Sequence, residues 1–543
     1  MTTTAARPAA ATRASWTPMI CLFLAQVLMS FNVAALPVSI GGMVEDFGVP
    51  PTAVSTAIVT YGLAVAALVM VGAKIGQRLG WVRVFRAVVA LFAVAELGMV
   101  LAPTVGWVIA AQALAGASAA IIVPSLVALI AENYHGTQQA TAIGSLGSAR
   151  AISGVSAFFI GGALGTLVGW RPVFAILLVI AAVVFALSFT LRSDHGNPAV
   201  TIDLVGALLI GAAVVMLTLG FNNLNGWGLL TADAGAPFDV LGVSPAPLLI
   251  VAGIILGQGF FVWTRRRTET GRVPLVSLSV LGSPQERAAV YAMFTVVALE
   301  AALNFTVPLY TQIVQGRTPF DTALAMMPFN LTVFVAALAV VRLYRRFTPR
   351  TIGVCAFILT TVALLWLSFV VTNNWETLPT IVGLIVFGAG QGALVTLVFN
   401  VLVTASPKEL AGDVGSVRGT TQNLASAVGT AVAGALLVTL LSVNVGQAVV
   451  RDVQLPDSLI AQVDLDNVNF VSNDRLREVL SRTDATPAQV EAAVAINTRA
   501  RLNALRLGLL FLAAISALAI LPASRLPNYR PHEIPEPANT SDD

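Results

Sequence analysis

Runs of apolar residues long enough to cross a lipid bilayer recur along almost the whole chain. Each run holds about 20 residues, and a helix rising about 1.5 Å per residue then crosses a hydrocarbon core roughly 30 Å thick. Of the 543 residues, 57% are hydrophobic and only 10% are charged, whereas soluble domains carry about 25% charged residues. The sequence therefore predicts an all-α integral membrane protein with many spans.

Polar or Pro/Gly breaks divide the chain into fourteen predicted spans. They cover residues 17–41, 52–73, 84–102, 105–130, 140–166, 171–191, 203–221, 245–264, 288–312, 321–341, 351–372, 378–404, 413–442 and 505–523. Residues 1–16 read as a short basic tail. No small-residue cleavage site follows the first run, so we expect that run to be retained as a helix.

Basic residues gather in alternate loops, which predicts the orientation of the chain. They follow the second, eighth and tenth spans, as Lys74, Arg78, Arg83, Arg86, Arg265, Arg266, Arg267, Arg272, Arg342, Arg345, Arg346 and Arg350. Cytoplasmic loops carry such an excess, so both termini are expected in the cytoplasm and the chain in the plasma membrane. The net charge of +3 then reflects topology, and no nucleic-acid partner is expected.

One predicted outer loop, 446–502, is unusually long. It contains two soluble-looking helical stretches, DRLREVLSR after Ser472 and PAQVEAAVAINTRARL, the second with Thr486 as N-cap and Pro487 at the first helical position. The loop is either a solvated cap over the outer mouth or a docking site for an envelope partner.

The remaining residues give no sign of an enzyme, a metal site or a cofactor. Cys21 and Cys355 fall inside apolar runs, and His135, His195 and His532 are scattered in predicted loops or the tail. The sequence shows neither metal-ligand spacing nor a phosphate-binding glycine loop.

A weak internal repeat relates the two ends of the chain. AKIGQRLGWVRVF matches VRLYRRFTPRTIG, and IGSLGSARAISG matches VGSVRGTTQNLA, at nearly equal offsets of 268 and 271 residues. Such repeats are typical of transporters. We expect two six-helix bundles, 17–191 and 288–523, with an inserted helix pair at 192–264, a cytoplasmic linker at 265–287 and a tail at 524–543.

Several short motifs appear in the order and spacing of one family. They are AALP (34–37), KIGQRLGWVRVF (74–85), WRPVF (170–174), DLVGALL (203–209) and PLYTQIVQGRTPFDTALAMMP (308–328). In these motifs the chain resembles the major facilitator superfamily, specifically its fourteen-helix drug:proton antiporter branch. The resemblance implies two bundles around a central cavity, alternating access, and a conformational role for the loop residues Lys74, Gln77, Arg78 and Arg83.

The chain departs from that family's pattern at four positions. Leu28 and Gln77 stand where the family has acidic residues, Gln112 where it has an arginine, and Phe158 where it has the proline of its antiporter motif. The resemblance therefore implies transport, but the family's coupling mechanism does not carry over directly.

The polar residues that remain inside predicted spans are the candidate site. Arg150 and Arg418 could be charge partners in the cavity or could snorkel to the cytoplasmic surface. Glu96 is expected to pair with another helix or to face lipid. Four amides could hydrogen-bond a substrate or join helices: Asn32, Gln112, Asn400 and Gln422.

Glu300, in the apolar run VALEAALNFTVPLYTQ, is the predicted proton-coupling residue. The repeat aligns Pro308 with Pro37 and places Glu300 opposite Met29, beside the position where the family has its missing acid. Asn304 follows one turn later on the same helix face. A carboxyl group in apolar surroundings favours its protonated form, so Glu300 could load and release a proton, with Arg150 or Arg418 as partner. The alternative is a glutamate that only joins helices.

The predicted function is secondary export of an apolar or amphipathic small molecule by a monomer, coupled to protons. One alternative is export of an endogenous lipid or envelope precursor. An alternative of another class is a non-transporting scaffold or sensor that acts through its outer loop.

Overall fold

The computed structural model describes residues 15–49, 51–134, 136–192, 195–233, 235–308, 310–311, 319–344, 346–372, 377–405, 410–451, 473–481 and 486–528. Within these ranges, every predicted span corresponds to a long helix. The fourteen long helices are α1 (Thr17–Phe47), α2 (Pro51–Leu79), α3 (Trp81–Val100), α4 (Val105–Asn133), α5 (Gly136–Leu167), α6 (Arg171–Leu187), α7 (Leu204–Asn222), α9 (Pro245–Glu269), α10 (Pro284–Pro308), α11 (Pro319–Leu343), α12 (Pro349–Val370), α13 (Leu378–Ala405), α14 (Ala411–Arg451) and α17 (Pro487–Leu518).

Thirteen of the helices in the described ranges are long and apolar enough to cross a membrane. The fourteenth, α3, has 20 residues and carries three charged side chains, Arg83, Arg86 and Glu96. Because the two arginines lie in its first turns, they can reach the membrane surface while the rest of the helix stays in the apolar layer.

Helix starts are set by local sequence. The side chains of Thr104, Asp203 and Ser244 accept hydrogen bonds from the backbone N–H groups of the first turns of α4, α7 and α9. Proline stands in the first turn of α9, α12 and α17, where its missing N–H costs nothing. These caps satisfy donors that would otherwise be bare at a membrane surface.

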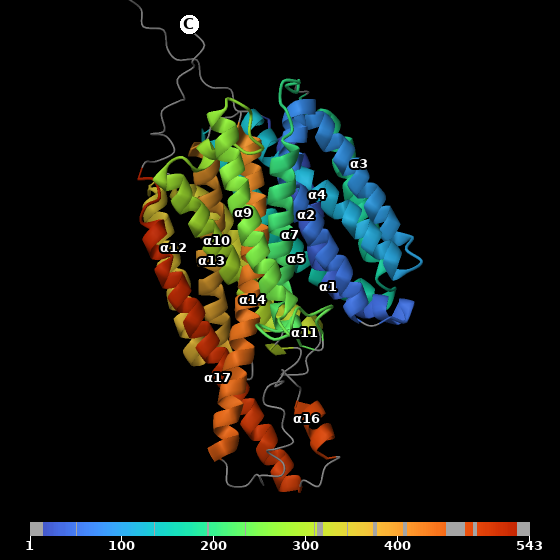
Figure 1. Ribbon diagram of the computed structural model, residues 1–543, viewed down its shortest axis with the longest axis vertical. Coiled ribbons are helices and arrows are strands. Elements are labelled where there is room, and N and C mark those ends of the chain that lie inside the picture. The colour runs from blue at the N-terminus through green and yellow to red at the C-terminus, as the bar shows by residue number, and fades with distance from the viewer. Residues whose placement is uncertain are drawn as a thin grey trace, which may run out of the picture.

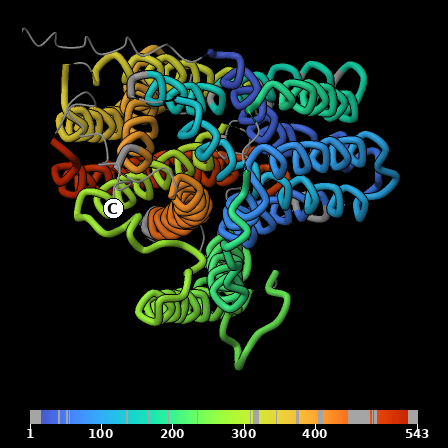
Figure 2. Tube along the Cα trace, turned by 90° about the horizontal axis from the view of Figure 1, so that it is seen from above, coloured from blue at the N-terminus to red at the C-terminus, as the bar shows by residue number. Residues whose placement is uncertain are grey.

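The helices of the first half pack mainly against one another, as do those of the second half. The closest pairs are α2 with α4 and α1 with α5 in the first half, and α11 with α13 and α10 with α14 in the second. Seen along the bundle, the blue helices lie on one side and the yellow helices on the other (Figure 2). The α7–α9 pair is set apart, and α7 contacts α2 and α14.

The two halves meet through two sets of helices. In one set, α5 packs against α11 and α13, and in the other α14 packs against α2 and α4. Both contacts involve the residues near the starts of α5 and α14, for instance Gly144 against Ala337 and Val341, and Gly415 against Pro124. The halves are therefore in contact at the end of the bundle predicted to be cytoplasmic.

Helices α14 and α17 project beyond the bundle at the opposite end, where α16 (Asn473–Leu480) lies beside α17 (Figure 1). The predicted N-cap at Thr486 is confirmed, and together with Gln489 it forms a capping box. The second soluble stretch of the 446–502 loop is not a separate helix, however. It continues without a break into the last span, because no proline or glycine interrupts residues 488–507. Residues 452–472 and 482–485 of this loop lie outside the described part of the chain.

The short helix α16 is fixed to α17 by polar contacts. Asn473 donates a hydrogen bond to Thr498 Oγ1 at 3.2 Å and accepts one from Arg501. Arg477 forms an ion pair of 2.9 Å with Glu491. Arg501 is fully buried, so α16 and the first turns of α17 form a small packed unit before the predicted span.

Candidate functional site

Glu300 on α10 and Arg150 on α5 form an ion pair between the two halves of the chain. Arg150 Nη2 lies 3.3 Å from Glu300 Oε1, and the two side chains are 39% and 16% exposed. Asn304, one turn after Glu300, is exposed. Of the two candidate partners for Glu300, the structure brings Arg150 into contact. All three side chains of this polar cluster on α5 and α10 therefore keep some exposed surface.

Arg418 is buried beneath the same region. Its side chain lies on α14 with 6% exposure, and its guanidinium carbon is 4.0 Å from the centre of the Phe399 ring on α13. The Arg418 Nε atom has no hydrogen-bond partner among the described residues. Arg418 therefore does not snorkel to the surface, and Arg150 turns toward Glu300 instead.

Two of the four candidate substrate amides bind each other. Asn32 Nδ2 donates to Gln112 Oε1 at 3.0 Å, and Gln112 Nε2 donates to Asn32 Oδ1 at 3.2 Å. Both side chains have no exposed surface. In this conformation the pair joins α1 to α4, as hydrogen bonds between amide side chains commonly do in membrane proteins.

The other two amides both lie in the second half. Asn400 is buried and donates to the Thr396 carbonyl at 3.0 Å, so it bonds within its own helix. Gln422 is half-buried on α14, one turn from Arg418. Of the four amides, Gln422 alone keeps partial exposure in the described structure.

A buried polar cluster lies at the predicted cytoplasmic end. Lys74 Nζ at the end of α2 lies 3.0 Å and 3.2 Å from the two carboxylate oxygens of Asp413, at the start of α14. The Gln77 side chain joins both, accepting from Lys74 at 3.0 Å and donating to Asp413 at 3.0 Å. The Ser277 backbone N–H also donates to Asp413, at 2.9 Å. Two helices and the linker thus meet at one carboxylate.

Glycines allow this close approach. A Cβ atom at Gly76 would lie 2.2 Å from the Trp81 ring, and one at Gly412 would lie 2.5 Å from the same ring. Trp81 is therefore wedged between α2 and the start of α14. Substitution of either glycine would push the halves apart at the point where Lys74 meets Asp413.

The four predicted conformational-loop residues separate into two pairs. Lys74 and Gln77 point inward to Asp413, whereas Arg78 and Arg83 are exposed and border a hollow at the surface. Of the departures from the family pattern, Leu28 is fully buried among apolar residues. The Phe158 side chain lies outside the described part of the structure.

The expectation for Glu96 is wrong on both counts. Its side chain has no exposed surface, so it does not face lipid, and neither carboxyl oxygen has a hydrogen-bond partner among the described residues. Glu96 falls on the buried face of α3 with Phe85, Phe92 and Met99. Those large apolar side chains pack inward, and Glu96 is buried because it lies on the same face of the helix.

Sequence reasoning did not identify Asp413 or Ser277. The available signal was the scarcity of charged residues near the spans. Asp413 stands at the start of one span and Lys74 at the end of another, both at the predicted cytoplasmic side, which could have suggested an ion pair. Within the described residues, no group of three His, Cys, Asp or Glu side chains could hold a metal ion.

A family model described as Major Facilitator Superfamily matches residues 22–430. The chain belongs to the major facilitator superfamily. Solved structures agree on the fold. The human organic anion transporter MFSD10 (TETRAN) superposes with a TM-score of 0.57 at 12% identity, covering 93% of this chain and 99% of that one. The proton:xylose symporter XylE superposes with a TM-score of 0.53 at 10% identity, covering 93% and 94%.

Curated relatives within this superfamily have similar lengths. The multidrug resistance protein Stp of Mycobacterium tuberculosis (strain CDC 1551 / Oshkosh) is 24% identical over 83% of this chain and 81% of its own. The multidrug efflux pump LfrA of Mycolicibacterium smegmatis is 25% identical over 79% and 82%. The cephamycin export protein CmcT of Amycolatopsis lactamdurans is 26% identical over 78% and 85%.

Proposed function

We propose that this protein is a proton-coupled exporter of an apolar or amphipathic small molecule in the plasma membrane. The observation that carries the proposal is the Arg150–Glu300 ion pair, because it joins the two halves through a group that can be neutralised by one proton. The relatives named above for multidrug resistance, efflux or export support outward transport.

The ion pair gives the two halves a proton-dependent link. While Glu300 is ionised, its carboxylate attracts the Arg150 guanidinium across the interface of α5 and α10. A proton on Glu300 removes that attraction and leaves Arg150 free to move with its own half. A partly exposed ion pair contributes about 0–1 kcal/mol, so its loss shifts the equilibrium by less than tenfold, for which about 1.4 kcal/mol is needed.

The buried cluster at Asp413 supports a conformation that is closed at the predicted cytoplasmic end. With Lys74, Gln77 and Ser277 all bonded to Asp413, the predicted cytoplasmic end is closed. Arg150 and Asn304 retain exposed surface. We infer a state in which a proton reaches Glu300 from the outer side, and in which opening of the cytoplasmic end requires the Asp413 cluster to separate.

The Glu300→Gln variant tests the coupling, because it keeps the side-chain shape and removes the titration. Liposomes that contain the protein are given a panel of fluorescent lipophilic dyes. When a pH difference is imposed, they should accumulate dye against its concentration gradient. Glu300→Gln should lose this uphill transport but keep exchange of dye for dye. Glu269→Gln, an exposed glutamate on α9, is the matched control and should transport normally.

Uphill transport by Glu300→Gln with an unchanged dependence on pH would show that the proton route lies elsewhere. Absence of any gradient-dependent dye movement by the unmodified protein would contradict export itself and favour a scaffold. The two results are distinguishable, because the second is observed with the unmodified protein and does not depend on any variant.

The orientation is tested by labelling single cysteines in a background with Cys21 and Cys355 replaced. Ser481→Cys, beyond α16, should react with an impermeant thiol reagent in intact cells. Thr270→Cys, at the end of α9, should react only after permeabilisation. The reverse pattern would overturn the proposed cytoplasmic location of the termini.

A further inference from the structure

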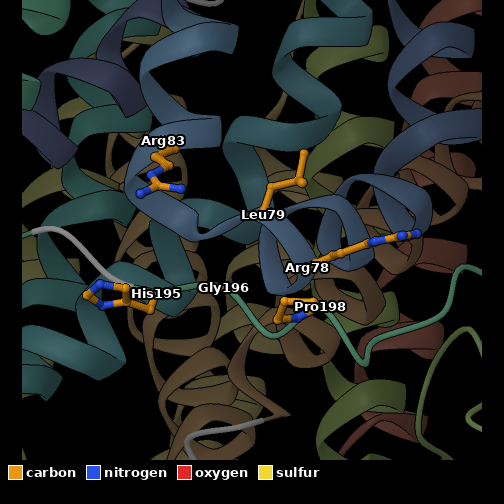
Figure 3. Close-up of a pocket in the computed structure, with 6 residues that line it drawn as sticks. All are labelled: Arg78, Leu79, Arg83, His195, Gly196 and Pro198. Carbon is orange, nitrogen blue, oxygen red and sulfur yellow. The ribbon is translucent and has the colours of Figure 1, made fainter.

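A surface pocket lies where the connection between α6 and α7 crosses the turn between α2 and α3. Its volume is about 270 Å³, and it is lined by Arg78, Leu79, Arg83, His195, Gly196 and Pro198 (Figure 3). The turn belongs to the predicted cytoplasmic end, so the pocket lies where lipid head groups and cytoplasmic solutes would both have access.

The connection is held firmly against the turn. The Asn197 N–H donates to the Gln77 carbonyl at 2.9 Å. A Cβ atom at Gly196 would lie 2.4 Å from the Arg78 carbonyl oxygen and from the Gly80 nitrogen, so only glycine allows this approach. The pocket wall is therefore built by backbone contacts and not by chance overlap of surface side chains.

The basic side chains of the pocket differ from their neighbours at the same end. Lys74 is paired with Asp413 and Arg267 with Asp203, and Arg86 donates to the Ser188 carbonyl. Arg78, Arg83 and His195 are exposed, and none of them makes an ion pair or side-chain hydrogen bond with another described residue. Positive charge thus surrounds the hollow without a protein counter-charge in the described structure.

We propose that this pocket binds a phosphate group, with Arg83 and His195 as its direct ligands. In the close-up, the Arg83 guanidinium and the His195 ring lie on the same side of the turn, whereas Arg78 extends to the other side (Figure 3). A guanidinium can donate two parallel hydrogen bonds to phosphate oxygens. An imidazole ring can donate a third. Arg78 contributes positive field without direct contact.

The apolar part of the lining suits the phosphodiester of an acidic phospholipid. Leu79 is 55% exposed beside the pocket, and Pro198 forms the facing wall. A free phosphate or phosphorylated metabolite carries the same chemistry, however, so the test separates the two sources. Clusters of basic residues just inside a membrane span commonly attract acidic lipids.

Occupation of the pocket should stabilise the closed cytoplasmic end. The segment 195–198 is bonded to Gln77, whose side chain holds Asp413 of the other half. A ligand that fixes this segment therefore favours the conformation in which Gln77 reaches Asp413. This role does not depend on Glu300 or on proton coupling.

The experiment compares the full-length protein with the variants Arg83→Gln, His195→Gln and the double variant. Retention of phosphatidylglycerol is counted by native mass spectrometry, and thermal unfolding is followed in detergent with and without inorganic phosphate. Arg266→Gln, an exposed arginine at the same end on α9, is the matched control. A single cooperative unfolding transition in each variant establishes that it is folded.

Lipid retained by the unmodified protein and by Arg266→Gln, but reduced about tenfold in the double variant, establishes a lipid phosphodiester site. Stabilisation by inorganic phosphate that only the double variant loses establishes a soluble phosphate site. The proposal is overturned by equal retention in all variants, by equal losses in the double variant and Arg266→Gln, or by no binding of either probe.

Discussion

Lys74 on α2 and Asp413 on α14 lie 3.0 Å apart in a contact that is almost wholly buried and joins the two halves of the chain. In the family that the chain resembles, the loop after the second helix carries its own acid, at the position of Gln77. Here the acid stands on the other half, and Gln77 serves as a neutral link between Lys74 and Asp413. The charge absent from one half is thus supplied by the other.

Loss of either charge should open the cytoplasmic end. Lys74→Met or Asp413→Asn leaves one buried charge without its partner, which costs about 3–5 kcal/mol, and should favour separation of α2 from α14. Ser416→Cys, on a buried position one turn after Asp413, should then react faster with a soluble thiol reagent. Transport should fall by at least about tenfold.

The reciprocal exchange Lys74→Asp with Asp413→Lys restores one ion pair. It should partly restore both the low reactivity of Ser416→Cys and the transport rate. Glu269→Gln breaks an exposed pair on α9 and should change neither, since such pairs contribute about 0–1 kcal/mol. If Ser416→Cys stays unreactive in both single variants, the contact does not hold this end closed.

Arg150 should set the pH range of transport. The Arg150→Gln variant removes the guanidinium 3.3 Å from Glu300, and with it the cation that stabilises the ionised carboxylate. The ion pair between the two halves is then absent at every pH, so the curve of transport rate against pH should move. Arg150→Lys should move it less, and Arg499→Gln, an exposed arginine on α17, should not move it. An unmoved curve for Arg150→Gln would separate Arg150 from the proton step.

The paired amides of α1 and α4 should contribute to stability and not to substrate recognition. Asn32→Leu alone leaves the buried Gln112 amide without its hydrogen-bond partner, which costs about 1–3 kcal/mol. Replacing both residues by leucine leaves no unpaired amide, so the free energy of unfolding should change little. Thermal unfolding of the purified protein measures both effects. Normal stability of the double variant with a changed preference among dyes would instead place the amides at the substrate.

The spans could be predicted from the sequence because each depends on one local property, a run of about 20 apolar residues between breaks. Thr486 is an equally local case, since a capping side chain and the amide it serves are three residues apart. The continuous helix after Thr486 is not evident from the sequence, because the polarity of residues 488–502 indicates a boundary. In the structure one unbroken helix runs from Pro487 to Leu518.

The partners inside the membrane were harder to predict for a physical reason. A soluble helix shows its buried face by an apolar stripe, but a helix in lipid is apolar all round. The sequence therefore identified Asn32, Gln112 and Glu300 as unusual without showing what each would meet. Asp413 was missed because its partner is 339 residues away, and only the packing of α2 on α14 brings them together.

Glu96 provides a test of whether a buried acid is structural or functional. Its carboxyl group is fully buried on α3, and neither oxygen has a hydrogen-bond partner among the described residues. Because such burial costs about 1–3 kcal/mol, Glu96→Leu, of similar size, should raise the melting temperature, whereas Glu96→Gln keeps a buried polar group and should not. Dye transport should be unchanged in both. Loss of uphill transport in Glu96→Leu, with a raised melting temperature, would instead show that Glu96 takes part in proton movement and that Glu300 does not act alone.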